Sequence, residues 1–289
     1  MAGIRRILMF IPGNNPAMIG NSLILGADSV VFDLEDAIAL EDKNDARFLV
    51  REALKTFNFG KIEPAIRING VTTEYWEEDL NEIVPCKPSF IQLPKVEHSY
   101  ELKMVIDRVA KIEEKCGIPV GTVKVGPILE TALGIENAFE IAKTCTDRLA
   151  GLFFGAEDFV ANICGIRTLE SKEIMYARQR LVVAARAVGL SPSDTAYINV
   201  DNDESLIEDC TLSKTLGFDG RAIVSPRQVK LARSLYLPSQ KEIDYAREVM
   251  AVIEDAKIKG RGAITLHGKM IDEPIAKRAR LILEAAEDL

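Results

Sequence analysis

Several carboxylates stand at the ends of segments that otherwise read as buried strands. GLFFGAEDF places two adjacent acids after an apolar run, SVVFDLED ends in three more, and VKVGPILE ends in one. These residues are Asp33, Glu35, Asp36, Glu130, Glu157 and Asp158. Carboxylates that face one another repel, and a bound cation offsets the repulsion. Oxygen ligands without a His or Cys cluster favour Mg²⁺ or Mn²⁺ over Zn²⁺. The alternative is that each acid caps a helix or lies in a solvated loop.

Three further polar residues end apolar strand-like runs. Arg67 and Asn69 close AIRIN, and Lys95 closes IQLPK. An arginine inside an apolar strand needs partners. It is either a fork for a substrate carboxylate or oxyanion, or one half of a structural ion pair with a strand-end acid.

The elements that would position these residues are eight short apolar runs that alternate with helix-patterned segments. The expected strands are residues 6–12, 27–34, 63–69, 89–95, 122–130, 148–155, 195–200 and 218–224. Near-continuous apolar runs are typical of parallel strands covered on both faces. The pattern predicts a (β/α)8 TIM barrel, with a doubly wound open sheet as the alternative. In such a barrel the carboxyl ends of the strands form the active-site mouth, where the polar residues fall.

The tail does not fit the eight-unit count. A long helix is expected from a cap at Ser239 to Gly260, then a short ribbon through GKMIDEP and a last helix from about Pro274. We therefore predict a catalytic domain over residues 1–235 and a C-terminal helical lid or extension over 236–289.

Composition narrows the class of protein. The 289 residues carry a net charge of −8, which argues against nucleic acid and anionic membranes as main partners. No run approaches the ~20 apolar residues of a membrane span. Five scattered cysteines without a C-x-x-C pair indicate free thiols in a reducing compartment, so a cytoplasmic location is expected.

Eight motifs, in order along nearly the whole chain, resemble one known group. They are RRILMFIPG, VVFDLEDAI, AIRING, IQLPK, ILETALGI, FFGAEDF, LGFDGRAIVSPRQ and GKMIDEP. The chain resembles the malyl-CoA/citramalyl-CoA lyase group of HpcH/HpaI aldolase-like enzymes, which includes the citrate lyase beta subunits. The resemblance implies an Mg²⁺-dependent barrel that cleaves a carbon–carbon bond in 3-hydroxyacyl thioesters.

The resemblance also implies roles for the candidate residues. Glu130 and Asp158 would bind the metal, and Arg67, Asn69 and Glu130 would contact substrate. A group behind them would support the metal site: Asp33, Glu35, Asp36, Lys95 and Glu157. Asp272 of the extension would protonate the enolate, although a residue just before Pro274 is also a natural helix N-cap.

Two departures from the group bear on the thioester carrier. The loop NNPAMIGNS carries no basic residue, and Ser225 stands where many relatives that use coenzyme A have a histidine. Both favour an acyl carrier protein. The expected reaction is citryl thioester to acetyl thioester and oxaloacetate, in a complex with carrier-protein and acyltransferase subunits, the chain itself forming trimers or hexamers.

Three alternatives remain. One is a citramalyl-CoA or malyl-CoA lyase, and another is a metal-dependent pyruvate aldolase, for which neither His98 nor His267 is well placed as a base. The third is a scaffold subunit without turnover.

Overall fold

The structure is a computed structural model that describes residues 5–258 and 264–287. Residue contacts divide it into two compact units, the first ending at Arg233 and the second beginning at Ser234. The division lies inside the helix α10 (Pro226–Tyr236), near the predicted boundary at 235/236. The expected helix end at Gly260 lies outside the described residues.

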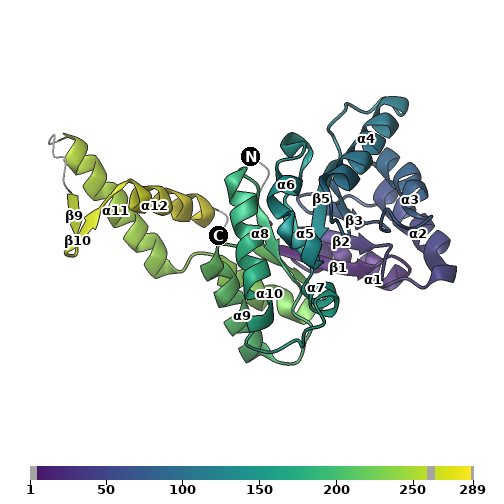
Figure 1. Ribbon diagram of the computed structural model, residues 1–289. Coiled ribbons are helices and arrows are strands. Elements are labelled where there is room, and N and C mark those ends of the chain that lie inside the picture. The colour runs from purple at the N-terminus through teal and green to yellow at the C-terminus, as the bar shows by residue number, and fades with distance from the viewer. Residues whose placement is uncertain (1–4, 259–263, 288–289) are drawn as a thin grey trace. The chain divides into compact units, whose positions relative to one another are not determined.

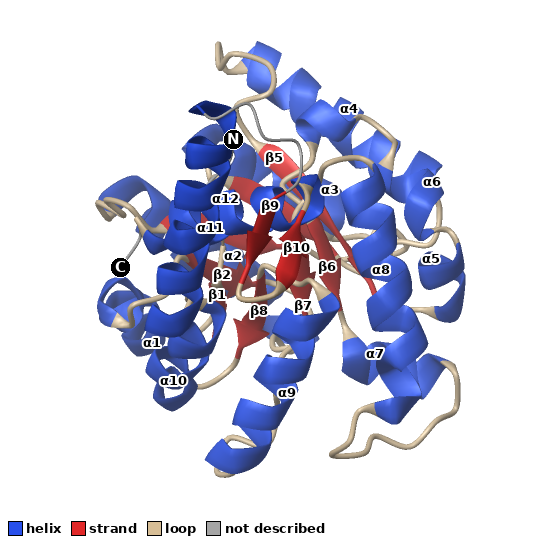
Figure 2. Ribbon diagram, turned by 90° about the vertical axis from the view of Figure 1, so that its left-hand side faces the viewer, coloured by secondary structure: helices blue, strands red, loops and turns tan. Residues whose placement is uncertain are grey.

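The first unit is a closed barrel of eight parallel strands in sequence order, so the barrel prediction is confirmed and the open sheet is excluded (Figures 1 and 2). The strands are β1 (Ile7–Pro12), β2 (Ser29–Asp33), β3 (Glu63–Arg67), β4 (Phe90–Leu93), β5 (Lys124–Leu129), β6 (Leu152–Phe154), β7 (Pro192–Asp194) and β8 (Gly220–Ile223). Strand β8 pairs with β1 and closes the barrel.

Helices surround the strands (Figure 2). They are α1 (Pro16–Asn21), α2 (Lys43–Thr56), α3 (Trp76–Ile83), α4 (Ser99–Lys115), α5 (Ala132–Glu136), α6 (Ala138–Ala142), α7 (Ala156–Asn162), α8 (Met175–Ala187), α9 (Asp203–Leu216) and α10. Short 3₁₀ turns are η1 (Ser22–Ile24), η2 (Leu40–Asp42), η3 (Val84–Cys86), η4 (Thr146–Arg148) and η5 (Lys172–Ile174). Helix α4 shows why such segments fold here: Leu102, Val105, Val109 and Ile112 recur at helical spacing and are all buried.

The barrel interior is built in layers because side chains two residues apart on a strand share a face. Leu8, Val31, Ala65 and Phe90 belong to one buried apolar cluster that also includes Ile128 and Phe153. The residues two positions further along the first four strands are Phe10, Asp33, Arg67 and Gln92, and all four line the cavity described below. An apolar floor therefore lies below a largely polar layer.

The seventh strand was placed wrongly from the sequence. It covers Pro192–Asp194, and the expected residues 195–200 form the loop that follows. Side chains satisfy the carbonyls of this loop: Arg221 Nη2 donates to Thr195 O at 3.0 Å, and Gln228 Nε2 donates to Tyr197 O at 3.1 Å. These bonds take the place of a strand ladder, which the alternating pattern TAYINV could not reveal.

The second unit confirms the expected helical extension. Helix α11 (Gln240–Ile258) begins after a reciprocal cap between Ser239 and Glu242. Strands β9 (Ile264–Leu266) and β10 (Lys269–Ile271) form an antiparallel hairpin that leads to α12 (Glu273–Ala286). The faces of α11 and α12 bury Ala246, Val249 and Ala276 in a cluster of their own.

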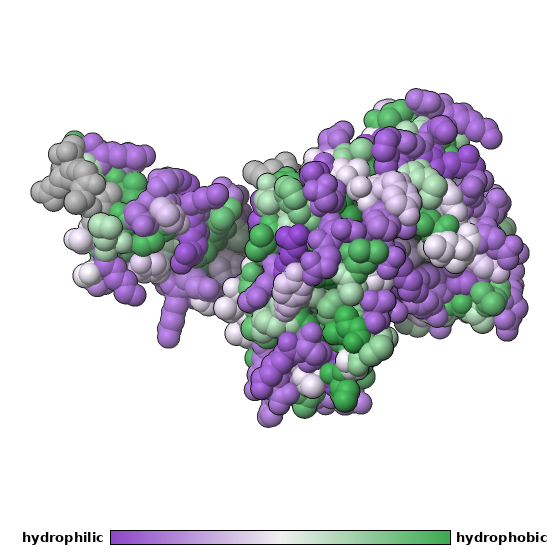
Figure 3. All heavy atoms as spheres, viewed as in Figure 1, coloured by the Kyte–Doolittle hydropathy of each residue, from purple (hydrophilic) through white to green (hydrophobic). Residues whose placement is uncertain are grey.

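No helix in the described part of the chain is long and apolar enough to cross a membrane. The face seen in Figure 3 is covered mainly by hydrophilic residues, with hydrophobic ones in small groups between them.

Candidate active site

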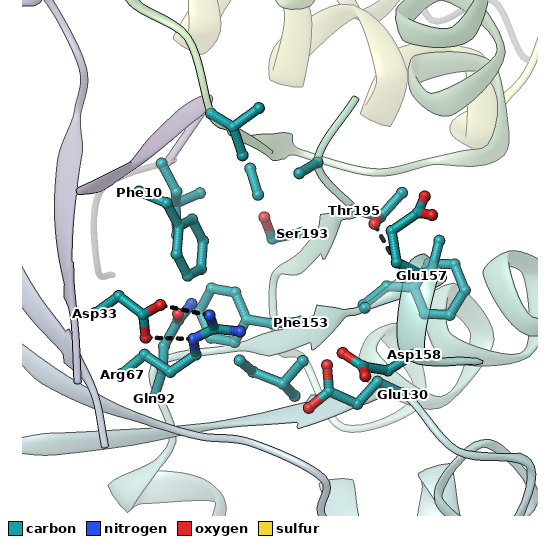
Figure 4. A pocket seen from close by; sticks show the side chains of 18 of the residues that line it. Phe10, Asp33, Arg67, Gln92, Glu130, Phe153, Glu157, Asp158, Ser193 and Thr195 are labelled. Atoms are coloured by element: carbon teal, nitrogen blue, oxygen red, sulfur yellow. Dashed lines mark hydrogen bonds and ion pairs between the residues drawn. The ribbon is translucent and has the colours of Figure 1, made fainter. Parts of the chain in front are cut away.

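A cavity of about 380 Å³ opens inside the barrel unit and collects most of the predicted acids. Its walls include Asp33, Arg67, Glu130, Glu157 and Asp158, which come from four different strand ends. Figure 4 shows Glu130 and Asp158 beside one another, with the pair Asp33–Arg67 across the cavity. The barrel therefore brings together residues that lie as much as 125 positions apart, from Asp33 to Asp158 (158 − 33).

Arg67 is fixed by a two-pronged ion pair. Its Nε and Nη2 donate to the two carboxylate oxygens of Asp33 at 2.7 and 2.6 Å, and its Nη1 lies 3.2 Å from Glu35. Burial alone would lower the pKa of this guanidinium, but the carboxylates of Asp33 and Glu35 outweigh it and raise the pKa. The ring of Phe10 packs against the guanidinium at 5.2 Å. The structural ion pair is therefore confirmed, and because Arg67 also lines the cavity, its contact with a substrate carboxylate or oxyanion stays a prediction.

Asp33 uses its remaining hydrogen-bonding capacity on the backbone. Its carboxylate accepts hydrogen bonds from the amides of Glu35 at 3.0 Å and Ala37 at 3.1 Å. Four donors on one carboxylate fix its orientation and, through it, that of Arg67.

Glu130 is the most perturbed acid of the site. Its side chain is almost fully buried, and one carboxylate oxygen accepts the backbone N–H of Lys95 at 2.7 Å. Burial, then the charges of Asp158 and Glu35, raise the pKa of Glu130 to about 8. Lys95 itself has a left-handed backbone, with φ of 53°, a conformation that a non-glycine residue adopts at some cost. The chain bends here so that an amide points at Glu130.

Gly155 makes room for Glu130. A Cβ at this position would lie 2.2 Å from Glu130 Oε2, although the backbone φ of −114° suits any residue. The glycine is therefore required for close approach and not for backbone freedom.

We expect Gly155→Ala to displace the Glu130 carboxylate. The variant should lose at least about 2 kcal/mol of unfolding free energy, as for other overpacked sites, and most metal affinity. Thermal unfolding and metal calorimetry would check this. Gly20→Ala is the matched control, because a Cβ there meets nothing within 4 Å. Equal behaviour of the two variants would contradict the close-approach argument.

Glu157 and Asp158 lie in the first turn of α7 but have different surroundings. The exposed Glu157 accepts a hydrogen bond from Arg167 Nε at 3.1 Å. Asp158 is only partly exposed, lines the cavity, and has no hydrogen-bond or ion-pair partner among the described residues. Of the two adjacent acids, Asp158 is the one available to a ligand.

Behind the cavity, Lys95 holds two more of the predicted acids. Its Nζ donates to Glu35 at 2.7 Å and to Asp36 at 3.3 Å. Burial raises the pKa of Glu35 in spite of Arg67 and Lys95. Glu35, Asp36 and Lys95 are not among the residues that line the cavity. Glu35 contacts both Arg67 and Lys95, and the backbone amide of Lys95 in turn binds Glu130.

Asn69 is not placed as expected. Its backbone N–H and side-chain amide donate to one oxygen of Asp79, at 2.9 and 2.7 Å, and Arg47 binds the other oxygen at 2.8 Å. Asn69 does not line the cavity. Asp79 of α3 thus connects Asn69, just after β3, to Arg47 of α2, and the predicted contact of Asn69 with substrate stays a prediction.

Asp272 lies in the second unit and caps a helix. Its Oδ1 accepts the N–H of Ile275 at 3.1 Å, which starts α12 as the sequence pattern allowed.

Sequence reasoning missed several lining residues, among them Phe10, Gln92, Ser193 and Thr195. The signal for Gln92 was a polar residue inside the apolar run SFIQLP. Ser193 was missed because the seventh strand was placed beyond it. Thr195 accepts the N–H of Ala156 at 3.0 Å and so fixes the start of α7.

The acids do not form a large metal cluster. Among the described residues, no group of three or more His, Cys, Asp or Glu side chains has the arrangement of a metal site. Of the lining carboxylates, Glu130 and Asp158 are the two that form no ion pair with any residue in the described part of the chain.

Comparison with known proteins identifies a family model and relatives that are similar to this chain over most of its length. Residues 6–226 match the family model "HpcH/HpaI aldolase/citrate lyase". The chain is 40% identical to the citrate lyase subunit beta of Leuconostoc mesenteroides subsp. cremoris, over 98% of this chain and 93% of that protein. It is 32% identical to the mitochondrial citramalyl-CoA lyase of Rattus norvegicus, over 99% of this chain and 87% of that protein.

A solved structure has the same fold over its full length. The CitE protein of Mycobacterium tuberculosis, in complex with magnesium, acetoacetate and coenzyme A, superposes with a TM-score of 0.82. The two are 27% identical, over 99% of this chain and 100% of that one. The barrel, its acidic mouth and these similarities together make the chain a member of the HpcH/HpaI aldolase/citrate lyase family and, with it, a carbon–carbon lyase.

Proposed function

We propose that this lyase cleaves a citryl thioester into acetyl thioester and oxaloacetate with Mg²⁺, as the beta subunit of a citrate lyase. The observation that carries the proposal is one cavity that holds two carboxylates, Glu130 and Asp158, opposite a fixed Arg67. The 40% identity to a citrate lyase subunit beta over almost the whole chain selects the citryl group.

The residues fit Mg²⁺ on chemical grounds. Mg²⁺ takes one or two protein carboxylates and fills its remaining positions with water or substrate oxygens. A nearly buried acid whose pKa is raised to about 8 beside a second carboxylate would be stabilised in its ionised form by a cation that takes the place of the proton. Glu130 and Asp158 would hold it. When bound, the metal supplies Lewis acidity toward the substrate hydroxyl and its neighbouring carboxylate.

The reaction needs a proton to leave the tertiary hydroxyl and a carbon–carbon bond to break. The electrons of the O–H bond form the ketone of oxaloacetate, and those of the broken carbon–carbon bond form the thioester enolate. Arg67 is already oriented by Asp33, so it stabilises the developing enolate oxygen or the oxoacid without reorganising. Protonation of the enolate carbon then gives the acetyl thioester. This proton balances the one that the hydroxyl lost, so the reaction consumes no proton in total.

We assign that protonation to Asp272. We also propose that the extension, residues 236–289, acts as a lid that excludes water. Catalysis itself is assigned to residues 1–235. Asp272→Asn separates acid from cap, because asparagine caps a helix as well as aspartate does. The variant should keep its thermal stability and lose about 10²-fold or more in turnover. If the variant instead lost thermal stability in proportion to its loss of turnover, Asp272 would act only as the N-cap of α12.

We further propose that the thioester is carried by an acyl carrier protein and that the chain works beside carrier-protein and acyltransferase subunits, as a homotrimer or hexamer in the cytoplasm. The absence of basic residues in NNPAMIGNS supports the carrier protein over free coenzyme A. The free thiols of Cys86, Cys116, Cys145, Cys164 and Cys210 support a reducing compartment such as the cytoplasm. A citramalyl-CoA lyase is the second candidate, supported by the 32% identity to such an enzyme.

The deciding experiment measures product release from citryl-carrier protein, citryl-CoA and citramalyl-CoA, each with Mg²⁺ and with EDTA. Wild type and Asp158→Ala should be compared after folding is checked by circular dichroism. We expect Mg²⁺-dependent cleavage of the citryl forms, lost in the variant. Cleavage of citramalyl-CoA alone would favour the second candidate. If no thioester were cleaved, the remaining hypotheses would be a metal-dependent pyruvate aldolase and a scaffold subunit without turnover.

Mg²⁺ affinity should rise with pH. Below pH 8 the Glu130 carboxyl holds a proton that the metal must displace, since its pKa is raised to about 8 from an ordinary 4.5. Between pH 6.5 and 8.5 the dissociation constant should fall by about 25-fold, with about one proton released per metal at pH 6.5. Calorimetry in buffers of different ionisation enthalpy measures both. A pH-independent affinity would show that Glu130 is ionised before the metal arrives.

A further inference from the structure

Two buried polar side chains face the cavity without a partner. Gln92 on β4 is 1% exposed and Ser193 on β7 is 6% exposed, and both line the cavity. Among the described residues, Gln92 Oε1 and Ser193 Oγ have no hydrogen-bond partner. A buried polar atom left unpaired costs about 1–3 kcal/mol, so native proteins seldom keep one without a ligand or other use.

Their position in the barrel is fixed by strand register. Gln92 pairs in register with Arg67, and Ser193 with Phe153. Gln92 lies one layer above Phe90, whose ring stacks on Phe153 at 5.7 Å. Figure 4 shows Gln92 beside the Arg67 guanidinium, with Ser193 on a different wall. Gln92 is therefore level with Arg67, and Ser193 lies on another wall of the cavity, level with the floor residue Phe153.

The surroundings select an anionic oxygen ligand. The carboxamide can turn its N–H groups toward the cavity, and the hydroxyl can donate as well. Arg67 supplies positive charge next to Gln92. The acid adjacent to Ser193, Asp194, is paired with Arg178 at 2.9 Å. Neutral donors next to a cation suit a carboxylate better than a neutral or positive group.

We propose that Gln92 and Ser193 form a subsite for the second carboxylate of the oxoacid fragment. This inference rests on the proposed function. It explains how the site would distinguish a citryl thioester, whose oxoacid fragment ends in a carboxymethyl arm, from a citramalyl thioester, which has a methyl group there. A site with polar groups intended for a ligand rejects the analogue that leaves them unpaired.

The test compares two substrates and two products on the full chain. Gln92→Leu and Ser193→Ala, alone and combined, are assayed on citryl and citramalyl thioesters with Mg²⁺. The combined variant should lose about 10²-fold or more in kcat/KM for the citryl thioester and less than about threefold for the citramalyl thioester. Calorimetry with Mg²⁺ should show wild type binding oxaloacetate at least about tenfold more tightly than pyruvate, and the variant losing that preference.

The chain offers a matched control. Among the described residues, Ser22 Oγ is also buried and unpaired, but Ser22 does not line the cavity. Ser22→Ala should leave both substrate ratios unchanged. Because Ser193→Ala removes only one oxygen, it gives a folded protein even if Gln92→Leu does not.

The outcomes separate the two proposals. Suppose that wild type cleaves the citryl thioester and that the variants lower kcat/KM equally for both thioesters, or for neither. The proposed subsite is then wrong and the lyase reaction stands. If wild type cleaves no thioester, the proposed function fails, and the oxaloacetate-to-pyruvate preference alone decides the subsite. Equal binding of the two oxoacids by wild type would overturn it.

Discussion

Glu130→Gln should abolish metal-dependent cleavage while making the metal-free protein more stable. The carboxyl of Glu130 keeps its proton up to a pKa of about 8 in the folded chain and up to an ordinary 4.5 when unfolded. As pH rises through this window the unfolded state releases the proton first, so folding stability is lost with rising pH. A neutral glutamine removes this loss. It also removes a metal ligand, with an expected decrease of about 10³-fold in kcat/KM.

The measurement is unfolding by urea at pH 5 and pH 8.5 in EDTA, together with Mg²⁺ calorimetry. The stability gain of the variant should be present at pH 8.5 and absent near pH 5. Glu157→Gln is the control, because Glu157 is exposed and paired with Arg167. That variant should change metal binding by less than about threefold. A Glu130→Gln protein that binds Mg²⁺ normally would remove Glu130 from the metal site.

Arg67→Met should cost both activity and stability, and the two losses should be separable. The substitution leaves Asp33 buried without its cation, although two backbone amides still bind it. Breaking such a pair costs about 3–5 kcal/mol, because one charge stays in a poorly solvated site. Loss of the guanidinium from the cavity should lower kcat/KM by about 10²–10³-fold.

The second variant, Arg67→Met with Asp33→Asn, removes the stranded charge. We expect it to recover most of the unfolding free energy and none of the activity. Arg5→Met is the matched control: Arg5 is also buried, pairs with Glu63 and packs on Phe90. It should be less stable but equally active per folded molecule. Recovery of activity in the double variant would make Arg67 a purely structural residue.

The fold could be predicted from the sequence because parallel barrels have a simple sequence pattern, in which short apolar strands alternate with amphipathic helices. Seven of the eight apolar runs that alternate with helical segments match strands, and the tail pattern predicted the capped helices of the extension. The period of two also fixes the interior layers, since Phe10, Asp33, Arg67 and Gln92 follow Leu8, Val31, Ala65 and Phe90 by two positions. Strand seven failed because TAYINV alternates like a strand although side chains satisfy its backbone.

The types of residue in the candidate site could be predicted from the sequence, but the hydrogen bonds and ion pairs between them could not. The sequence placed Asp33, Arg67 and Glu130 at strand ends, and the family motifs suggested their roles. It could not show that Asn69 is held by Asp79, or that Lys95 uses its backbone amide on Glu130. Such contacts depend on the register between neighbouring strands and on single side-chain rotamers, which carry no periodic signal.

The alternation of strands and helices, the acids at strand ends and the helical tail were thus predicted from the sequence alone, because each depends on local periodicity and on residue type. Closure of the sheet into a barrel was decided only by the tertiary structure. The tertiary structure decided which carboxylate stays unpaired, which acid has a raised pKa and which buried groups face the cavity. Those properties arise from burial and from distances across the barrel. They exist only after segments far apart in the chain have been closed around one axis.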